Sequence, residues 1–308
     1  MKVSVIIPSK NRANVLADTL ETLLSQTCVP DEIVIVDQSV GDETKKAVAN
    51  FTERVRLSGN TKPEFLYLYD PSLIGAGAAR NIAIDRSYGE ILVFLDDDVL
   101  LEHDFLQEML LVYQRNPDVG GVSGVITNYP SPPSARRIWD ALFCIGPFHD
   151  ERQPIYWNCD RLRQAKPIPV RRFGSGLMSV KRSALNGDRF DDWYRGAGPE
   201  DVDLTWRLSE RCSLVITPQA RLVHVRTSAD GPREHWLSYA VKSHYYLYHR
   251  LWNAGVANRL CFAWLNIGYA LLATLASLRH HSFAPWRAFR AGIRGAKEIL
   301  SRESISVK

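Results

Sequence analysis

Apolar residues in the first 126 positions form short runs that alternate with segments of helical spacing. The runs at 3–7, 32–37, 65–68, 91–95 and 119–126 predict strands, and the segments 15–26, 43–51, 76–86 and 103–115 predict helices. Strands that alternate with helices are typical of βαβ units and of a mostly parallel sheet. Because such crossovers are right-handed, we expect the loops after the strands to meet at one edge of the sheet.

The regular pattern breaks at 129–135, which is rich in Pro and Ser and predicts a loop. No element is assigned from there to about residue 170. Further on, 199–211 is predicted as a helix, 214–216 and 221–225 as short strands, and the chain from 234 onward as helical.

One segment of this C-terminal part, residues 260–278, contains no formal charge. Its length is near the roughly 20 residues that span a bilayer. Asn266, Gly268, Thr274 and Ser277 weaken that interpretation, and the basic stretch 284–297 that follows has an amphipathic pattern. A buried helix, a membrane-surface helix and a true span therefore remain as three alternatives.

Composition narrows the class of protein. With 308 residues, 45% hydrophobic and 23% charged, the chain can bury a sizeable core, which excludes wholesale disorder. The net charge of +4 is unevenly placed, because Arg, Lys and His dominate after residue 221. This asymmetry indicates an anionic partner for the C-terminal part, either a membrane surface or phosphate. The chain starts directly with a strand and without signal-peptide features, so we expect a cytoplasmic active site.

Three consecutive acids, Asp96, Asp97 and Asp98, follow the buried strand 91–95. Open α/β sheets bind ligands outside the carboxyl ends of their strands. Clustered carboxylates repel one another and are costly to desolvate unless a cation or donors compensate. A hard divalent ion such as Mg²⁺ or Mn²⁺, shared with a diphosphate, would do so. The alternative is a solvated acidic loop.

Three more segments are expected at the same edge. The helix start after Pro8, with Lys10 and Arg12, would suit an anion, although a simple capped helix explains it as well. Asp37 ends the second strand, where it could accept a hydrogen bond from a nucleobase. The glycine-rich segment 75–81 permits close backbone approach and supplies Arg80 for phosphate.

Together these segments resemble the family 2 glycosyltransferases of GT-A fold. The resemblance is carried by 3–12, 36–39, 77–81 and 94–98, by Gly174-Ser-Gly-Leu-Met178, which resembles the acceptor-side glycine loop, and by 198–207, which resembles the "ED" helix. The six segments follow one another in register over about residues 2–226. The resemblance implies an α/β fold of GT-A type with a Rossmann-like nucleotide-binding half and a helical C-terminal extension.

The resemblance also implies a donor and a metal. A nucleotide-diphosphate sugar would bind over the first half, with Mn²⁺ or Mg²⁺ on its diphosphate. Asp98 matches the principal metal ligand and Asp96 a ribose or metal contact, while Asp97 is the variable middle position and is expected to be a spectator. A histidine similar to His224 completes the metal shell in several members, although a lone histidine is often structural. The residues grouped at the donor are Pro8, Lys10, Arg12, Asp37, Gly77, Arg80, Asp96 and Asp97.

The acceptor side follows from the later motifs. Asp201 matches the base that takes the acceptor's hydroxyl proton, and Glu200 would orient the acceptor. Acids at a helix start also cap it, which is the structural alternative. Asp203 is expected to pair with Arg207 four residues later. The residues grouped at the acceptor are Gly174, Ser175, Gly176 and Trp193. Gln38 and Leu177 depart from the family pattern. The first departure leaves the nucleobase of the donor open, and the second leaves the acceptor contacts open.

We therefore expect an inverting hexosyltransferase-type enzyme that acts on a glycan or lipid-linked acceptor in surface polysaccharide synthesis. Residues 1–228 would form the glycosyltransferase domain, with a donor half at 1–126 and an acceptor half at 127–228. Residues 229–308 would form an extension that contacts the inner face of the cell membrane through 259–297, and no nucleic-acid partner is expected. A sugar nucleotidyltransferase and a non-catalytic glycan-binding protein remain as alternatives; the first leaves Glu200 and Asp201 unexplained, and the second has no use for a base.

Overall fold

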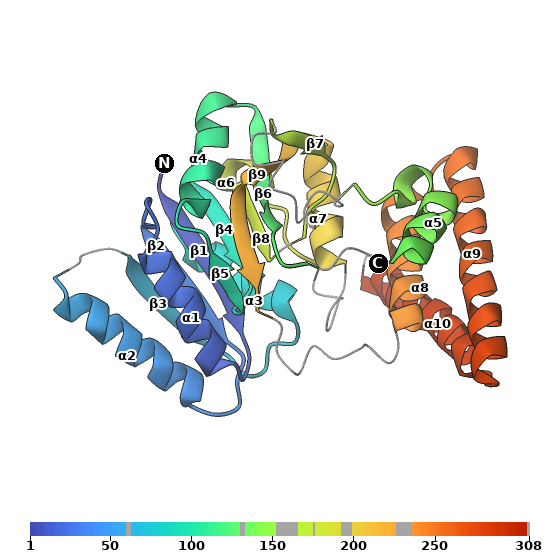
Figure 1. The fold of residues 1–308 in the computed structure, drawn as a ribbon, viewed down its shortest axis with the longest axis horizontal. Coiled ribbons are helices and arrows are strands. Elements are labelled where there is room, and N and C mark those ends of the chain that lie inside the picture. Colours follow the sequence, from blue (N-terminus) through green and yellow to red (C-terminus); the bar gives the residue numbers. More distant parts are fainter. Residues whose placement is uncertain are drawn as a thin grey trace. The chain divides into compact units, whose positions relative to one another are not determined.

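The computed structural model describes residues 1–59, 63–129, 133–151, 166–174, 176–191, 199–225 and 236–306 (Figure 1). The chain divides into two compact units, which are Met1–Ser131 with Glu151–Arg226, and Pro132–Asp150 with Thr227–Lys308. One boundary between the units lies near residue 227, and residues 132–150 belong to the C-terminal unit. They do so because helix α5 (Ser134–Phe143) buries Trp139 and Phe143 beside helix α9 (Val256–His280). The expected functional domains stay a prediction.

The first unit is built on a mixed sheet. Its described strands are β1 (Val3–Ser9), β2 (Glu32–Asp37), β3 (Glu64–Tyr69), β4 (Ile91–Leu95), β5 (Val99–Leu101), β6 (Val119–Ile126), β7 (Ile168–Val170), β8 (Leu177–Lys181) and β9 (Ser213–His224). They lie in the order β3-β2-β1-β4-β8-β6-β9-β5, with β7 paired to β9. Strands β3, β2, β1 and β4 are parallel, as predicted. Beyond β4 the sheet is mixed, because β8 runs antiparallel to both β4 and β6.

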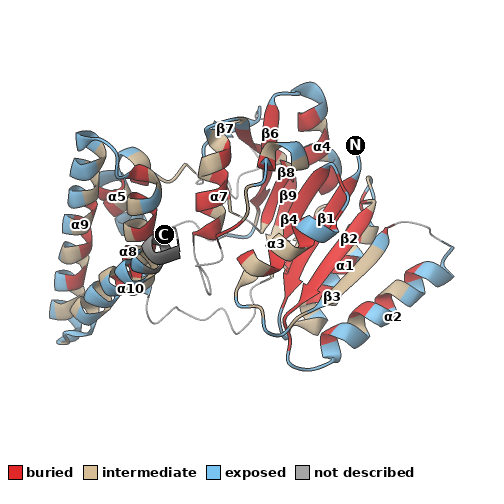
Figure 2. Cartoon of the chain, turned by 180° about the vertical axis from the view of Figure 1, so that it is seen from behind, coloured by how far each residue is buried: buried red, intermediate tan, exposed pale blue. Residues whose placement is uncertain are grey.

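Helices cover this sheet and form the second unit. The first unit contains α1 (Ala13–Leu24), α2 (Glu43–Leu57), α3 (Ala76–Arg86), α4 (Phe105–Arg115), α6 (Arg182–Leu185) and α7 (Glu200–Ser209). The second contains α5, the short 3₁₀ helix η1 (Gly146–Phe148), α8 (Trp236–Leu247), the π-helical turn η5 (Tyr248–Trp252), α9 and α10 (Ala284–Ser306). Every residue of β1, β2 and β4 is buried (Figure 2), so the central strands are fixed on both faces and hold their carboxyl ends in place.

The predicted strands and helices of residues 1–126 are confirmed, apart from their exact ends and the unpredicted β5. The two short strands expected at 214–216 and 221–225 are instead one strand, β9. Pro218 lies between the two expected strands, and there the pairing of β9 with β6 shifts its register between Ile216 and Arg221. A bulge of this kind accommodates a residue that cannot donate to the ladder.

Candidate active site

Parallel pairing brings the ends of β1, β2 and β4 to one edge of the sheet. Ser9 lies beside Asp37 in the register of β1 and β2. The Ser9 hydroxyl donates to Asp97 Oδ2 at 2.7 Å, and the Asn11 amide donates to Ser39 Oγ at 2.7 Å. Asn11 has a left-handed backbone (φ 57°), which turns the chain from β1 into α1. The predicted convergence of these loops is therefore confirmed.

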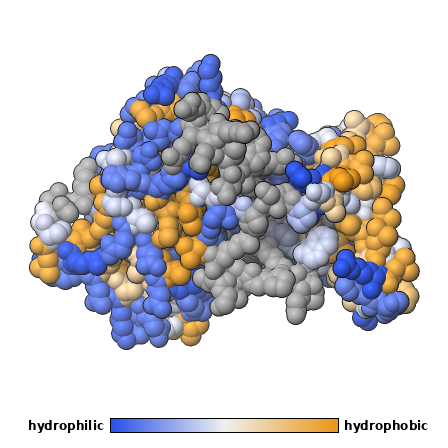
Figure 3. Space-filling view, in the orientation of Figure 1, coloured by the Kyte–Doolittle hydropathy of each residue, from blue (hydrophilic) through white to orange (hydrophobic). Residues whose placement is uncertain are grey.

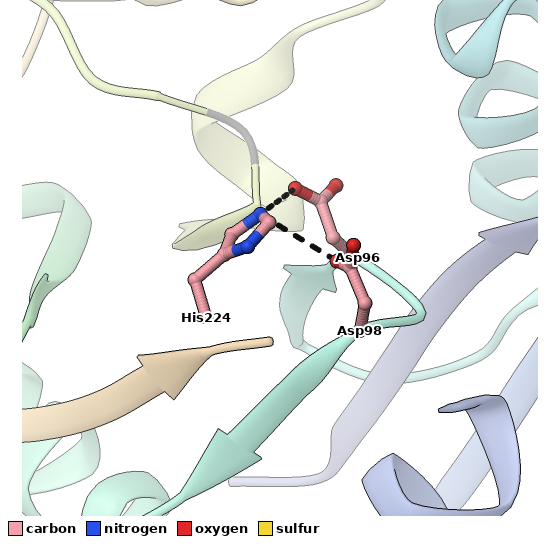
Figure 4. Close-up of side chains that lie close together, drawn as sticks. All are labelled: Asp96, Asp98 and His224. Atoms are coloured by element: carbon pink, nitrogen blue, oxygen red, sulfur yellow. Dashed lines mark ion pairs between the residues drawn. The ribbon is translucent and has the colours of Figure 1, made fainter. Parts of the chain in front are cut away.

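Two of the acids and a histidine form a cluster at this edge (Figure 4). His224 Nε2 lies 3.5 Å from Asp98 Oδ1 and 3.9 Å from Asp96 Oδ2. The pairing of β5 with β9 sets His224 opposite Val99, the residue after Asp98, and the Val225 amide donates to the Asp98 carbonyl at 2.7 Å. The strand pairing thus places His224 beside acids that precede it by more than 120 positions in the sequence.

This cluster fits a hard divalent ion. One ligand atom from each of Asp96, Asp98 and His224 lies within 4.8 Å of the others. Two carboxylate oxygens and one imidazole nitrogen are ligands that suit Mn²⁺. Mg²⁺ would also bind the two oxygens, but it favours nitrogen ligands less. The three residues were predicted to share a metal, and the structure brings all three together.

Asp97 makes structural contacts that the sequence did not predict. Its side chain is buried and accepts the hydrogen bond from Ser9 already described, while Arg12 Nη1 lies 3.4 Å from Asp97 Oδ1. Burial raises the pKa of Asp97 to about 6, and the hydrogen bond from Ser9 and the charge of Arg12 oppose that rise. Asp97 therefore ties the β1 loop to the end of β4. A donor contact of its own stays a prediction.

The basic residues of the first loop take different positions. Arg12 donates to Asp98 Oδ2 at 2.6 Å, so in this structure it neutralises an acid of the cluster. Lys10 is exposed at the same edge. Pro8 is buried inside β1, opposite Val36. Contacts of these three residues with a donor stay predictions.

Asp37 is fully buried, and both of its oxygens accept hydrogen bonds from protein groups. The Ser39 amide donates to Oδ1 at 2.9 Å and the Tyr67 hydroxyl to Oδ2 at 2.5 Å. Burial, followed by the contact with Asp37, raises the pKa of Tyr67. Sequence reasoning missed Tyr67; the signal for it was its place on β3, the strand that pairs with β2. Reading of a nucleobase by Asp37 stays a prediction.

Arg80 is the centre of a buried ion network. Its side chain is 2% exposed, and Nη2 donates to Asp96 Oδ1 at 3.0 Å. Nη1 lies 3.5 Å from Glu200 Oε1 at the start of α7. The sequence predicted a phosphate contact, whereas the structure shows Arg80 joining the donor-side acids to the acid beside the expected base. Gly77 packs beside this network, since a Cβ there would lie 3.4 Å from Glu200 Cγ, an ordinary contact distance.

Glu200 and Asp201 begin α7. Burial, and then the negative charge of Asp201, raise the pKa of Glu200 to about 8, while Arg80 opposes the rise. The Val202 amide donates to Asp201 Oδ1 at 2.7 Å, a contact within the first turn of α7. The N-cap position is Pro199 and makes no side-chain cap hydrogen bond, so neither acid caps the helix, although acids in its first turn favour the helix dipole. Asp201 is partly exposed.

The glycine loop runs against acids of both halves of the site. A Cβ on Gly176 would collide with the Asp96 carboxylate, and a Cβ on Gly174 would lie 3.8 Å from Asp201 Oδ2. Gly176 therefore lies against the metal cluster and Gly174 near the start of α7. The predicted acceptor residues Ser175 and Trp193 lie outside the described residues.

Polar contacts of Asp203 and Arg207 anchor helix α7 to the rest of the unit. Asp203 is fully buried and accepts from Arg207 at 2.7 Å, so the predicted i,i+4 pair is confirmed. Arg207 also donates to Asp188 Oδ1 at 2.6 Å and to the Arg189 carbonyl at 2.7 Å. These bonds fix the orientation of the helix whose first turn carries Glu200 and Asp201.

Comparison with known proteins identifies the family. Residues 4–185 match the family described as glycosyl transferase family 2. The chain belongs to this family. Among curated relatives of this family 2 chain, the validoxylamine A glucosyltransferase of Streptomyces hygroscopicus subsp. limoneus is 27% identical over 229 residues, which are 67% of this chain and 47% of that protein. The O-antigen chain rhamnosyltransferase RfbN of Salmonella typhimurium is 26% identical over 125 residues, covering 40% of this chain and 37% of that one. The chain thus spans about half the length, or less, of these relatives.

Solved structures confirm the fold of this family 2 chain. The mannosyltransferase PcManGT from Pyrobaculum calidifontis, solved in complex with GDP-Man and Mn²⁺, superposes with a TM-score of 0.59 at 19% identity, covering 96% of this chain and 86% of that one. GalNAc-T7, solved with UDP, GalNAc and Mn²⁺, superposes with a TM-score of 0.61 at 15% identity, covering 100% of this chain and 57% of that one. The GT-A-like α/β fold predicted from the sequence is therefore confirmed.

Proposed function

We propose that this family 2 chain transfers a sugar from a nucleotide-diphosphate sugar to a hydroxyl group of an acceptor, with inversion at the anomeric carbon. The observation that carries the proposal is the spatial relation of two acidic groups. The cluster of Asp96, Asp98 and His224 reaches the Glu200–Asp201 pair through Arg80. A donor held at the first group would present its anomeric carbon toward the second.

In the proposed reaction, the acceptor oxygen attacks the anomeric carbon from the face opposite the diphosphate. The bond from that carbon to the diphosphate oxygen breaks, and the nucleoside diphosphate leaves with the electron pair. Asp201 takes the hydroxyl proton as the new bond forms. Because one displacement replaces the leaving group, the configuration inverts.

The charged residues of the metal cluster, the two arginines beside it and Glu200 have different roles in this scheme. Asp96, Asp98 and His224 would hold a divalent ion, which when bound supplies positive charge against the leaving diphosphate. Arg80 and Arg12 keep the acids of the cluster oriented and partly neutralised. Glu200, whose raised pKa lets it keep a proton near neutral pH, would donate a hydrogen bond to the acceptor and leave proton removal to Asp201.

The acceptor is proposed from the relatives. The matched proteins include enzymes named for O-antigen and teichuronic acid biosynthesis. We infer a glycan or lipid-linked acceptor at the cytoplasmic face of the cell membrane. A nucleotidyltransferase or a non-catalytic glycan-binding protein has no need of Asp201 beside the metal cluster, so neither is favoured.

Thermal unfolding with a panel of nucleotide sugars, with and without Mn²⁺, tests the proposal. A donor present at 100 times its Kd stabilises the folded state by about 2.7 kcal/mol. We expect one class of nucleotide sugar to stabilise the chain only with Mn²⁺, and Asp98→Asn to abolish that effect. Stabilisation by no nucleotide sugar, or equal stabilisation in chelator, would contradict the proposal.

A further inference from the structure

One face of α9 exposes a continuous line of large apolar side chains. Their spacing of four, four, three, four, four and three residues keeps them on one side of the helix over about 33 Å. The residues are Val256, Leu260, Trp264, Ile267, Leu271, Leu275 and Leu278, each between 43% and 70% exposed. The opposite side of α9, with Leu265, Gly268, Tyr269 and Ala273, is buried within the same unit.

Helix α5 extends this line into a broader surface. Ile138, Leu142 and Ile145 on and just after α5 are 41–61% exposed. The two helices are joined at Trp264, whose Nε1 donates to the Leu142 carbonyl at 2.7 Å and whose ring stacks on Phe143. Figure 3 shows hydrophobic residues gathered over α5 and α9. We call the exposed residues of α9, with Ile138, Leu142 and Ile145, the apolar face. An exposed apolar surface of this extent marks a binding site more often than chance exposure.

The same unit is strongly basic. Residues 133–150 and 236–301 contain ten Lys and Arg against three acids, which are Asp140, Asp150 and Glu298. On α10, four exposed bases recur at a spacing of three, four and three residues and so share one side of the helix: Arg287, Arg290, Arg294 and Lys297. Arg259 and Arg279 lie exposed near the two ends of the apolar line on α9.

The packing of α9 excludes two of the three sequence alternatives. The first alternative, a buried helix, is excluded because the large apolar residues on one side of α9 are exposed. Among the described residues, α9 is the one helix long and apolar enough to span a membrane. However, Tyr269 is buried and accepts or donates a 2.6 Å hydrogen bond with His244 of α8, and α10, with its four bases, packs on both α8 and α9. A spanning α9 would carry those charges into the hydrocarbon, at a high cost.

We propose that the second unit docks on the surface of an anionic lipid bilayer. The apolar face lies in the interfacial region with α9 parallel to the membrane plane, and the bases of α10 and of the ends of α9 attract the lipid phosphates. A second copy of this chain is a poorer occupant, because pairing the apolar faces would bring two basic surfaces together. The proposal goes beyond sugar transfer and does not depend on it.

Flotation of the full chain with vesicles tests this docking. We expect the chain to float with vesicles of phosphatidylcholine mixed with phosphatidylglycerol, and not with phosphatidylcholine alone. Leu271→Glu combined with Leu275→Glu should abolish flotation. Arg290→Glu combined with Arg294→Glu should weaken binding to the anionic vesicles by about tenfold or more. The matched control is Val40→Glu combined with Leu57→Glu, which places the same charges on exposed apolar positions of the other unit and should float normally.

Three results would overturn the proposal. The first is no flotation with either vesicle, and the second is flotation that survives the change of Leu271 and Leu275. The third is a dimer in analytical ultracentrifugation that those two substitutions dissociate, in the absence of vesicle binding. Circular dichroism melting of each variant shows whether it is folded. Donor stabilisation with Mn²⁺, measured on the same variants, should be unchanged, so a failure of docking is distinguishable from a failure of the proposed transferase.

Discussion

Substitution of Glu200 by glutamine tests the electrostatics of the site. Burial and the charge of Asp201 raise the pKa of Glu200 from 4.5 to about 8. Between these two values the folded state keeps a proton that the unfolded state has lost, so the stability of the wild-type protein falls as the pH rises through this window. The glutamine in Glu200→Gln does not titrate, so the stability of this variant does not show that decrease with pH.

The size of the effect follows from the same two values. Between pH 5 and pH 8 the stability of Glu200→Gln relative to wild type should rise by about 3 kcal/mol. For a unit of this size the difference in Tm between the two proteins should widen by about 6–12 °C. Calorimetry at pH 5, 6, 7 and 8 in chelator measures it.

Glu210→Gln is the matched control, because Glu210 follows α7 directly and its carboxylate is exposed, paired with Arg171 at the surface. Its Tm difference from wild type should stay nearly constant over the same range. A Glu200→Gln difference that is equally flat, or that shrinks as the pH rises, would refute the reasoning, since it would mean that Glu200 is already ionised at pH 5.

Three further substitutions test single contacts. Gly176→Ala should weaken Mn²⁺ binding by about tenfold or more in calorimetric titration, because its Cβ would displace the Asp96 carboxylate; unchanged binding would show that the loop does not constrain Asp96. His224→Ala should raise the Mn²⁺ concentration needed for half-maximal donor stabilisation by about 10–100-fold, and an unchanged requirement would remove His224 from the metal site. Arg207→Met should destabilise the protein to urea by about 3 kcal/mol, because it leaves Asp203 buried without its ion pair; a change below about 1 kcal/mol would contradict that role.

Two of these substitutions have matched controls. Gly174→Ala adds the same methyl group to the same loop, but at 3.8 Å from Asp201, an ordinary contact distance, so Mn²⁺ affinity should not change. His280→Ala removes an exposed imidazole at the end of α9 and should leave the Mn²⁺ requirement as it is.

Much of the donor half could be predicted because its strands are visible in the local sequence pattern and its polar residues directly follow those strands. Buried apolar runs identified β1, β2 and β4, and the polar residues that follow them could only meet at one edge of a parallel sheet. The pairing of Asp203 with Arg207 was likewise predictable, since four residues on a helix bring two side chains together.

The contacts that could not be predicted join residues far apart in the sequence. Asp97 looked like a spectator because its partners, Ser9 and Arg12, precede it by more than 80 positions. Arg80 looked like a phosphate ligand because nothing nearby in the sequence indicates that α7 brings Glu200 against it.

Helix α5 was hidden for a similar reason. Its pattern is apolar on more than one side, because Trp139 and Phe143 pack inward while Ile138 and Leu142 are exposed. A helix with two apolar sides, preceded by a Pro-rich segment, has no clear helical period in the sequence. Its place in the second unit depends on α9, more than 100 residues later.

Asp201→Asn tests the central claim most directly. With the donor found by thermal unfolding and its acceptor, the rate of sugar transfer by Asp201→Asn should fall by about 10²–10⁴-fold, the usual contribution of a general base. Stabilisation by the donor with Mn²⁺ should stay at the wild-type level, because Asp201 lies on the acceptor side. Transfer at the wild-type rate by Asp201→Asn would contradict the account.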